Sequence, residues 1–180
     1  MRKLANAELN RLTPEAYKQS PKNNFVLVLD NVRSLNNVGS AFRTGDAFLV
    51  EKIYLCGITG TPPHREIHKT ALGATDSVEW EYVVKTIDLV HQLKSAGYCI
   101  VVLEQTADSV MLQHFAINPQ QRYAFVFGNE IEGVSEEVVA LADYTVEIPQ
   151  FGTKHSINIS VSIGIVVWDY FCKTLPPPAY

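Results

Sequence analysis

Four uninterrupted apolar runs constrain the fold of this chain more than any other feature. The first, Phe25 to Leu29, ends directly in the polar pair Asp30-Asn31, and similar runs follow at Lys52 to Cys56, Tyr98 to Leu103 and Tyr123 to Phe127. Apolar runs without polar alternation are typical of strands that are buried on both faces of a sheet. A shorter candidate strand spans Val146 to Ile148, next to Pro149.

Segments with helical spacing of their apolar residues separate these runs. They span Val38 to Phe48, Ile87 to Ala96, Glu136 to Ala142 and about Ile157 to Leu175. A short helix is also expected after Thr13-Pro14, a cap followed by proline at the first helical position. This alternation predicts an α/β fold, with a mostly parallel sheet, helices on both faces and a ligand site beyond the carboxyl ends of the strands.

The length and composition predict one main domain. With 180 residues and 47% hydrophobic content, the chain has material for one substantial core. We expect an N-terminal helical extension over residues 1–24, the domain over 25–175 and a tail over 176–180, where three prolines end the last helix. The first ten residues are polar where a signal peptide is apolar, and no segment has the length of a membrane span. We therefore expect a cytoplasmic protein without membrane partners.

Charge and cysteine content narrow the function further. A formal net charge of -4 disfavours a protein that coats nucleic acid nonspecifically, because such binding requires many cations, so any RNA contact is expected to be local. Cys56, Cys99 and Cys172 each lie in an apolar run, which favours buried, reduced thiols over disulfides. None has the spacing of a metal site, and we expect no metal.

Common signatures of nucleotide chemistry are missing from the chain. The first strand is followed by Asn31 to Asn37 instead of the GxGxxG loop of dinucleotide-binding folds. The chain also has no Walker loop, HExxH, GxSxG or kinase signature, so most hydrolase and phosphotransferase functions lose support. Three polar segments at predicted strand ends remain as candidates for the site.

The first polar segment runs from Asn36 to Phe48. Its small residues let a helix begin close against the sheet, and Arg43 emerges within two turns, where an arginine suits a phosphate group. The alternative is a surface arginine paired with Asp46, a common contact worth only a few tenths of a kcal/mol.

The second polar segment runs from Phe127 to Ser135 and follows a buried strand directly. Gly128 and Gly133 permit close approach of the backbone to a ligand. The alternative is an ordinary turn into a helix that Ser135 caps. That alternative accounts for Ser135 but leaves Glu130 unexplained.

The third polar segment, Ile148 to Ser160, leads into an apolar helix. Polar groups that enter a buried helix need partners, which makes Ser156 and Asn158 candidates for the site. In the alternative, Ser156 caps the helix, Asn158 is a satisfied core amide, and Lys154-His155 is a solvated edge.

In order and spacing, these three segments resemble the motifs of the SpoU (TrmH-type) family of the SPOUT RNA methyltransferase superfamily. The resemblance covers about residues 25 to 172, and its motifs correspond to Asn37 to Phe48, Gly128 to Gly133 and Ile148 to Asn158. It implies a C-terminal trefoil knot, a homodimer, and S-adenosylmethionine bound in the knot. That cofactor has no phosphate, which agrees with the missing glycine-rich loop.

The resemblance also assigns residues to the site. The cofactor-binding positions that it implies are Leu103, Gly128, Ile148, Ser156 and Ile157. Its catalytic positions are Asn37 and Arg43, with Glu130, Ser156 and Asn158 shaping the loops that hold the cofactor and the arginine. A basic rim near the motifs is the expected RNA contact, formed by Arg33, Arg65, Lys69 and Lys154. His64 and His68 are equally well explained as solvated side chains.

The function that follows is methylation of a ribose 2'-hydroxyl in tRNA or rRNA. We expect Arg43 to act electrostatically, because a guanidinium with a pKa above about 12 is a poor base. Two alternatives remain open. One is a SPOUT enzyme that methylates a base nitrogen, and the other is a noncatalytic RNA-binding module with the same fold.

Overall fold

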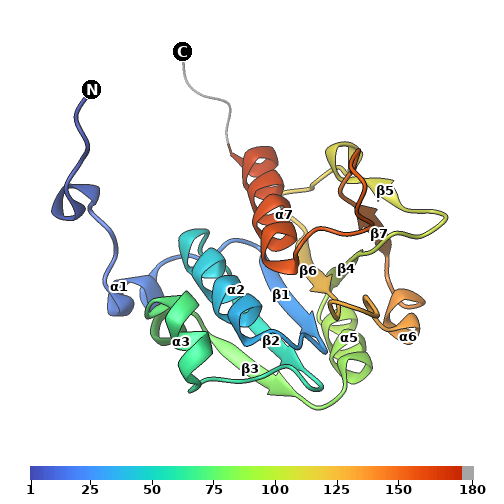
Figure 1. The fold of residues 1–180 in the computed structure, drawn as a ribbon. Helices are drawn as coiled ribbons and strands as arrows, with labels where there is room; N and C mark the ends of the chain where they lie inside the picture. The colour runs from blue at the N-terminus through green and yellow to red at the C-terminus, as the bar shows by residue number, and fades with distance from the viewer. Residues whose placement is uncertain (176–180) are drawn as a thin grey trace.

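The computed structural model describes residues 1–175 and contains a seven-stranded parallel sheet with helices on both faces (Figure 1). The order of the strands in the sheet is β3-β2-β1-β6-β4-β7-β5, and every pair is parallel. The strands are β1 (Phe25–Asp30), β2 (Lys52–Cys56), β3 (Trp80–Val83), β4 (Tyr98–Leu103), β5 (Val110–Met111), β6 (Arg122–Phe127) and β7 (Tyr144–Glu147). The predicted α/β class with a mostly parallel sheet is confirmed.

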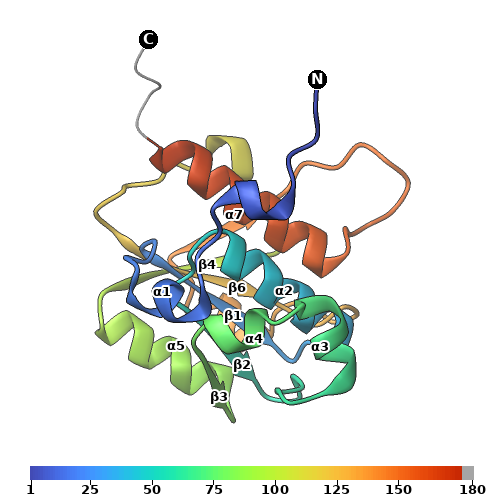
Figure 2. The ribbon, with the colours of Figure 1, turned by 90° about the vertical axis from the view of Figure 1, so that its left-hand side faces the viewer.

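Helices α2 and α7 cover one face of the sheet, and α5 covers the other (Figure 2). The short helix α6 contributes to the same core as α5. The shorter helices α3 and α4 pack against α2. The helical elements are η1 (Asn6–Leu9), α1 (Pro14–Gln19), α2 (Leu35–Ala47), α3 (Arg65–Ala71), α4 (Ala74–Ser77), α5 (Thr86–Ser95), η2 (Leu112–His114), α6 (Glu136–Val139) and α7 (Ile159–Thr174).

Burial on both faces explains the unbroken apolar runs of the central strands. In β1, Leu27 and Leu29 belong to the core beneath α2 and α7, whereas Val26 and Val28 belong to the core beneath α5. All six residues of β1 are buried. Because successive side chains of a strand point to opposite faces, a strand with helices on both sides needs apolar residues at every position.

An aromatic cluster anchors α7 to the sheet. The ring of Tyr170 lies 4.8 Å from that of Phe25, 5.9 Å from that of Phe125 and 6.1 Å from that of Tyr123, measured between centroids. Tilted and edge-to-face contacts at these distances are favourable. The cluster therefore fixes the helix that follows the third polar segment.

Glycine lets α2 approach α3 closely. A Cβ at Gly39 would overlap the Thr70 hydroxyl and the carbonyl of Ile67, so no larger residue fits without movement. The Thr70 hydroxyl donates to the carbonyl of Asn36 at 3.1 Å. The small residues of the first polar segment thus serve contact between two helices, in addition to the expected contact with the sheet.

Some elements differ from the sequence prediction. The edge strands β3 and β5 and the helices α3 and α4 were not predicted, because they are short and partly exposed and have no long apolar run. Strand β7 begins two residues earlier than predicted and α6 ends three residues earlier. Helix α7 begins at Ile159 because the Asn158 side chain, and not Ser156, caps it by accepting from the amide of Ser160 at 2.9 Å.

The prediction of three buried thiols is only partly right. Cys56 is buried and Cys99 is half-buried, and burial raises the pKa of their thiols to about 12 and about 11. Cys172 is exposed on α7, so the prediction is wrong there. An apolar run on a helix includes its outer face, which the sequence pattern did not separate from the inner one. All three cysteines are free.

The expected N-terminal helix forms as α1, with the Thr13 hydroxyl accepting from the amide of Ala16 at 3.2 Å. Its Tyr17 belongs to the main core and donates to the carbonyl of Gly45 at 3.2 Å. The predicted tail over residues 176–180 lies outside the described residues. Within residues 1–175, no helix has the length and apolar character to cross a membrane.

Candidate functional site

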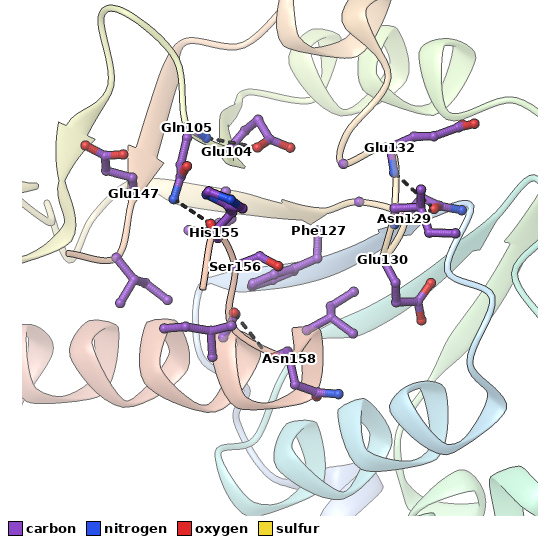
Figure 3. Close-up of a pocket in the computed structure, with 18 of the residues that line it drawn as sticks. Glu104, Gln105, Phe127, Asn129, Glu130, Glu132, Glu147, His155, Ser156 and Asn158 are labelled. Carbon is purple, nitrogen blue, oxygen red and sulfur yellow. Dashed lines mark hydrogen bonds between the residues drawn. The ribbon is translucent and has the colours of Figure 1, made fainter. Parts of the chain in front are cut away.

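A cavity of about 440 Å³ lies at the carboxyl ends of β4, β6 and β7 (Figure 3). This is the edge of the sheet where the sequence predicted a ligand site, and the volume is that of an ordinary small-molecule pocket. Three loops far apart in sequence meet there. The lining residues are Leu103, Glu104, Gln105, Phe127, Gly128, Asn129, Glu130, Ile131, Glu132, Gly133, Val146, Glu147, Ile148, Gln150, His155, Ser156, Ile157, Asn158, Ile159 and Ser162.

Every residue that the sequence assigned to the cofactor lines this cavity, as do Glu130 and Asn158. The five cofactor positions are Leu103, Gly128, Ile148, Ser156 and Ile157. In Figure 3, Ser156 and Asn158 lie on the segment that leads into α7, while Asn129 and Glu130 lie on the segment after β6. The second and third polar segments therefore form one site.

The structure explains why residue 128 is glycine, which the sequence did not show. A Cβ at this position would overlap the backbone of Gly133 and Val134, so the close approach is to the chain itself. Asn129 and Gly133 exchange backbone hydrogen bonds of 2.8 and 2.9 Å, which folds the intervening loop back on itself. The two glycines thus allow the tight loop that forms one wall of the cavity.

Glu130 connects the first and second polar segments. Its carboxylate accepts from the backbone amides of Arg33 and Ser34 and from the Asn37 side-chain amide, each at 3.0 Å. Partial burial raises the pKa of this carboxyl, but the hydrogen bonds from Arg33, Ser34 and Asn37 outweigh burial and hold the pKa below its usual value. Asn37 is itself buried and does not line the cavity.

Arg43 does not reach the cavity of its own chain. It lies exposed in the second half of α2, outside the lining, and within residues 1–175 it forms neither the ion pair with Asp46 nor any other. The expected RNA contacts are also exposed, and Lys69 lies 3.9 Å from Glu66. These exposed residues are Arg33, Arg65, Lys69 and Lys154.

His64 has a structural role as the cap of α3, which accounts for the residue without a contact to RNA. Its imidazole Nδ1 accepts from the backbone amide of Glu66 at 3.1 Å and so caps α3. His68 is exposed on the same helix. Within residues 1–175, no group of three or more His, Cys, Asp or Glu side chains is placed to hold a metal ion.

Sequence reasoning assigned no role to Glu104 and Gln105, which tie the three loops together. The Glu104 carboxylate accepts from the amides of Val134 at 3.1 Å and Gln105 at 3.0 Å. The Gln105 side chain donates to the carbonyl of His155 at 3.2 Å (Figure 3). The available signal was their position, directly after the apolar run of β4.

The chemistry of the lining suits a positively charged nucleoside without phosphate. Leu103, Phe127, Ile148 and Ile157 provide apolar surface for an aromatic base. The ionisable lining side chains are His155 and four carboxylates, and no Lys or Arg among residues 1–175 contributes to it. Carboxylates repel a phosphate and attract a cation. S-adenosylmethionine, which carries a sulfonium and an adenosine but no phosphate, fits this set of groups.

Comparison with known proteins identifies the family. Residues 24–168 match the SpoU rRNA Methylase family. The chain belongs to this family. The match includes all three polar segments, and the resemblance noted from the sequence is confirmed.

Members of the SpoU family with assigned activities are similar to this chain over most of its length. It is 30% identical to a tRNA (guanosine(18)-2'-O)-methyltransferase of Borreliella burgdorferi over 84% of this chain and 67% of that protein. It is also 30% identical to the 23S rRNA (guanosine-2'-O-)-methyltransferase RlmB of Neisseria meningitidis, over 79% of this chain but only 56% of that protein. The chain thus spans between about half and two thirds of the length of these relatives.

A solved structure of an rRNA methyltransferase has a similar fold. The AdoMet-bound rRNA methyltransferase from Sinorhizobium meliloti superimposes with a TM-score of 0.79 at 25% identity, covering 91% of this chain and 60% of that one. AdoMet is S-adenosylmethionine, the cofactor expected from the sequence. The likeness in fold therefore includes a relative that binds this cofactor.

Proposed function

We propose that this SpoU-family protein transfers the methyl group of S-adenosylmethionine to a ribose 2'-hydroxyl of tRNA or rRNA. The observation that carries the proposal is the cavity, in which all five cofactor positions meet among apolar and carboxylate side chains. The 2'-O-methyltransferase activities of the two 30%-identical relatives support the reaction. The proposal names both tRNA and rRNA as substrates, because one relative is a tRNA methyltransferase and the other a 23S rRNA methyltransferase.

The cofactor supplies an activated methyl group on a sulfonium, and the chain has to bind and orient it. We assign the adenosine to the apolar part of the cavity, between Leu103, Ile148 and Ile157. Glu130 acts indirectly, because its three hydrogen bonds hold the start of α2 against this loop.

The 2'-hydroxyl has to lose its proton as its oxygen bonds to the methyl carbon. We assign Arg43 to the RNA side of the reaction, where its guanidinium positions the phosphate and stabilises the developing negative charge on oxygen. Asn37 holds Glu130 and thereby the helix that carries Arg43. We assign Ser156 and Asn158 to shaping the loop before α7, where Asn158 caps the helix.

We further propose a homodimer with a shared site and a C-terminal trefoil knot. Arg43 lies outside the cavity of its own chain, which a contribution to the partner's cavity would explain. The knot is supported by family membership and by the Gln105–His155 contact, which holds the loop after β4 against the segment before α7. The RNA contacts that we propose are Arg33, Arg65, Lys69 and Lys154. We propose the cytoplasm as the location of the protein, because tRNA and rRNA are found there.

A transfer assay tests the function. The purified protein is incubated with methyl-labelled S-adenosylmethionine and with separate tRNA and rRNA pools that lack the modification, and the RNA is then hydrolysed with alkali. Label in nucleotides whose neighbouring phosphodiester resists alkali supports the proposal, because a methylated 2'-oxygen does not attack that bond. Label in a base indicates the base-methylating alternative. Cofactor and RNA binding without transfer to either pool indicates the noncatalytic module.

A further inference from the structure

Asp30, at the carboxyl end of β1, is a buried carboxylate to which the proposed mechanism gives no role. Its side chain is 1% exposed and does not line the cavity. Burying a carboxylate is costly unless hydrogen bonds compensate for the lost water. Asp30 is fully compensated, because four donors from three different segments of the chain converge on its two oxygens.

The two oxygens of Asp30 serve different partners. Oδ1 accepts from the Thr86 hydroxyl at 2.5 Å and from the Asn31 side-chain amide at 2.8 Å. Oδ2 accepts from both the backbone amide and the hydroxyl of Ser135, each at 3.0 Å. One oxygen therefore faces the start of α5, and the other holds the segment that leads into α6.

Ser135 ends the loop from Gly128 to Gly133 that forms one wall of the cavity. The expected role of Ser135 as a side-chain cap of α6 is wrong, because its hydroxyl is used on Asp30. The other end of the loop is held by the neighbour of Asp30. The Asn129 side-chain amide donates to the carbonyl of Asn31 at 2.9 Å. The pair Asp30-Asn31 thus grips the loop at both ends.

Asn31 has an unusual backbone conformation that orients these hydrogen bonds. Its φ of 56° lies in the left-handed region, which asparagine tolerates better than most residues. Its side-chain oxygen accepts from the amide of Ile58 at 3.1 Å, so the turn after β1 is also tied to the turn after β2. The groups that hold the loop therefore lie in a turn that is itself fixed by hydrogen bonds, at the end of the central strands.

We propose that Asp30 is a positioning residue for the cofactor, acting through Oδ2 on the loop from Gly128 to Ser135. The inference rests on the proposed function, since it takes S-adenosylmethionine as the ligand of the cavity. Asparagine at position 30 offers a single acceptor oxygen. If that oxygen keeps Thr86 and Asn31, the new amide group meets the N–H of Ser135, donor against donor. The loop then loses its hydrogen bond from the Ser135 amide, while the volume of the side chain at position 30 is nearly unchanged.

The test compares Asp30→Asn and Ser135→Ala with Thr86→Val, a matched control that removes a hydrogen bond from the other oxygen of the same carboxylate. Affinity for S-adenosylmethionine is measured by calorimetry, melting temperature by calorimetry without ligand, and amide hydrogen exchange in residues 129–135 by mass spectrometry. We expect Asp30→Asn to raise the Kd about tenfold or more and to speed exchange in the loop, as loss of hydrogen bonds to a charged group implies.

Thr86→Val is expected to lower the melting temperature while leaving the Kd within about twofold of wild type. Ser135→Ala is expected to raise the Kd less than Asp30→Asn does, because the backbone amide of Ser135 remains. Ser135→Thr keeps the hydroxyl and should return the Kd to the wild-type value.

If Asp30→Asn does not fold, the comparison of Ser135→Ala with Ser135→Thr tests the inference. Kd values that follow melting temperature equally in all variants, or loop exchange unchanged in both Asp30→Asn and Ser135→Ala, would overturn the inference. Absence of binding by the wild type would instead overturn the proposed function.

Discussion

At the scale of single residues, a small set of carboxylates organises the loops around the cavity. Glu130 binds the start of α2, Glu104 binds the amide of Val134, and Asp30 binds Ser135. Each accepts at least one backbone amide from a segment distant in sequence. Because an ionised carboxylate accepts on both oxygens, one such residue satisfies donors on two segments at once.

Glu130→Gln is expected to lower stability in a pH-dependent way. Since the folded pKa of Glu130 is below its usual value, its ionised form stabilises the fold above the usual glutamate range, and this stabilisation is lost as pH falls through the lowered pKa. The difference in melting temperature between wild type and Glu130→Gln should be largest near neutral pH and shrink in acid. Glu132→Gln is the control, because no described residue donates to its carboxylate. An equal pH dependence for both variants would contradict the prediction.

Arg43→Ala is expected to leave the Kd for S-adenosylmethionine nearly unchanged, because Arg43 is assigned to the ribose and its phosphate on the RNA and not to the cofactor. Methyl transfer to RNA should fall about a hundred- to a thousandfold, by analogy with other preorganised electrostatic donors whose loss costs about 3 to 4 kcal/mol. Arg43→Lys should recover little, since a point charge does not replace the planar fork. Single-turnover rates with saturating RNA provide the measurement, and a near-normal rate for the alanine variant would make Arg43 a structural residue.

At the scale of elements, α7 has two apolar faces. Its inner face, with Ile163, Val167 and Tyr170, is buried against the sheet. Its outer face carries exposed apolar residues as well, at Val161, Trp168 and Cys172, and Leu175 follows directly after its last turn. Val161, Trp168 and Leu175 are about half exposed. A helix with apolar residues on its outer face needs a further partner in water, and the proposed dimer supplies one.

Trp168→Glu is expected to convert the proposed dimer to a monomer, because a charge among the exposed apolar residues of α7 opposes their burial. Sedimentation velocity at micromolar concentration measures the change. Val84→Glu is the matched control, since Val84 is a more exposed apolar residue, at 70%, away from α7. A wild-type protein that sediments as a monomer would refute the dimer, as would a Trp168→Glu variant that remains dimeric.

At the scale of the whole molecule, the proposed cofactor site and the proposed RNA contacts differ in the sign of their charge. The cavity is lined by carboxylates, whereas the cations proposed for RNA are exposed side chains outside the lining, in loops and on α3. With a net charge of -4, the protein has no general attraction for polyanions. RNA binding is then expected to depend on a local arrangement of cations, and the carboxylates of the cavity are expected to disfavour phosphorylated nucleotides.

S-adenosylmethionine is expected to bind equally well with and without a chelator, because its methyl group is already activated. Millimolar ATP should not displace it, since the four carboxylates of the lining repel a triphosphate. Isothermal titration calorimetry measures both effects, with S-adenosylhomocysteine as a competitor that should displace the cofactor. Binding that requires a metal, or that ATP abolishes, would contradict this prediction.

The sequence by itself determined the parallel sheet, its central strands and two of the three segments that line the cavity. Runs such as Phe25 to Leu29 are local patterns, and burial on both faces leaves a direct trace in them. The three polar segments were also visible, because polar residues that follow buried strands stand out. What the pattern could not show was short or half-exposed structure, such as β3 and α3, whose composition resembles that of loops.

Only the tertiary structure decided which of these segments meet and how. The contact of Glu130 with Asn37, the clasp of Ser135 by Asp30, and the position of Arg43 outside its own cavity all depend on residues up to about a hundred positions apart. Local periodicity reports whether a residue faces the core, and it contains no information on which distant donor reaches a given carboxylate. That pairing is set by the order of the strands in the sheet, which brings the ends of β1, β4, β6 and β7 to one edge.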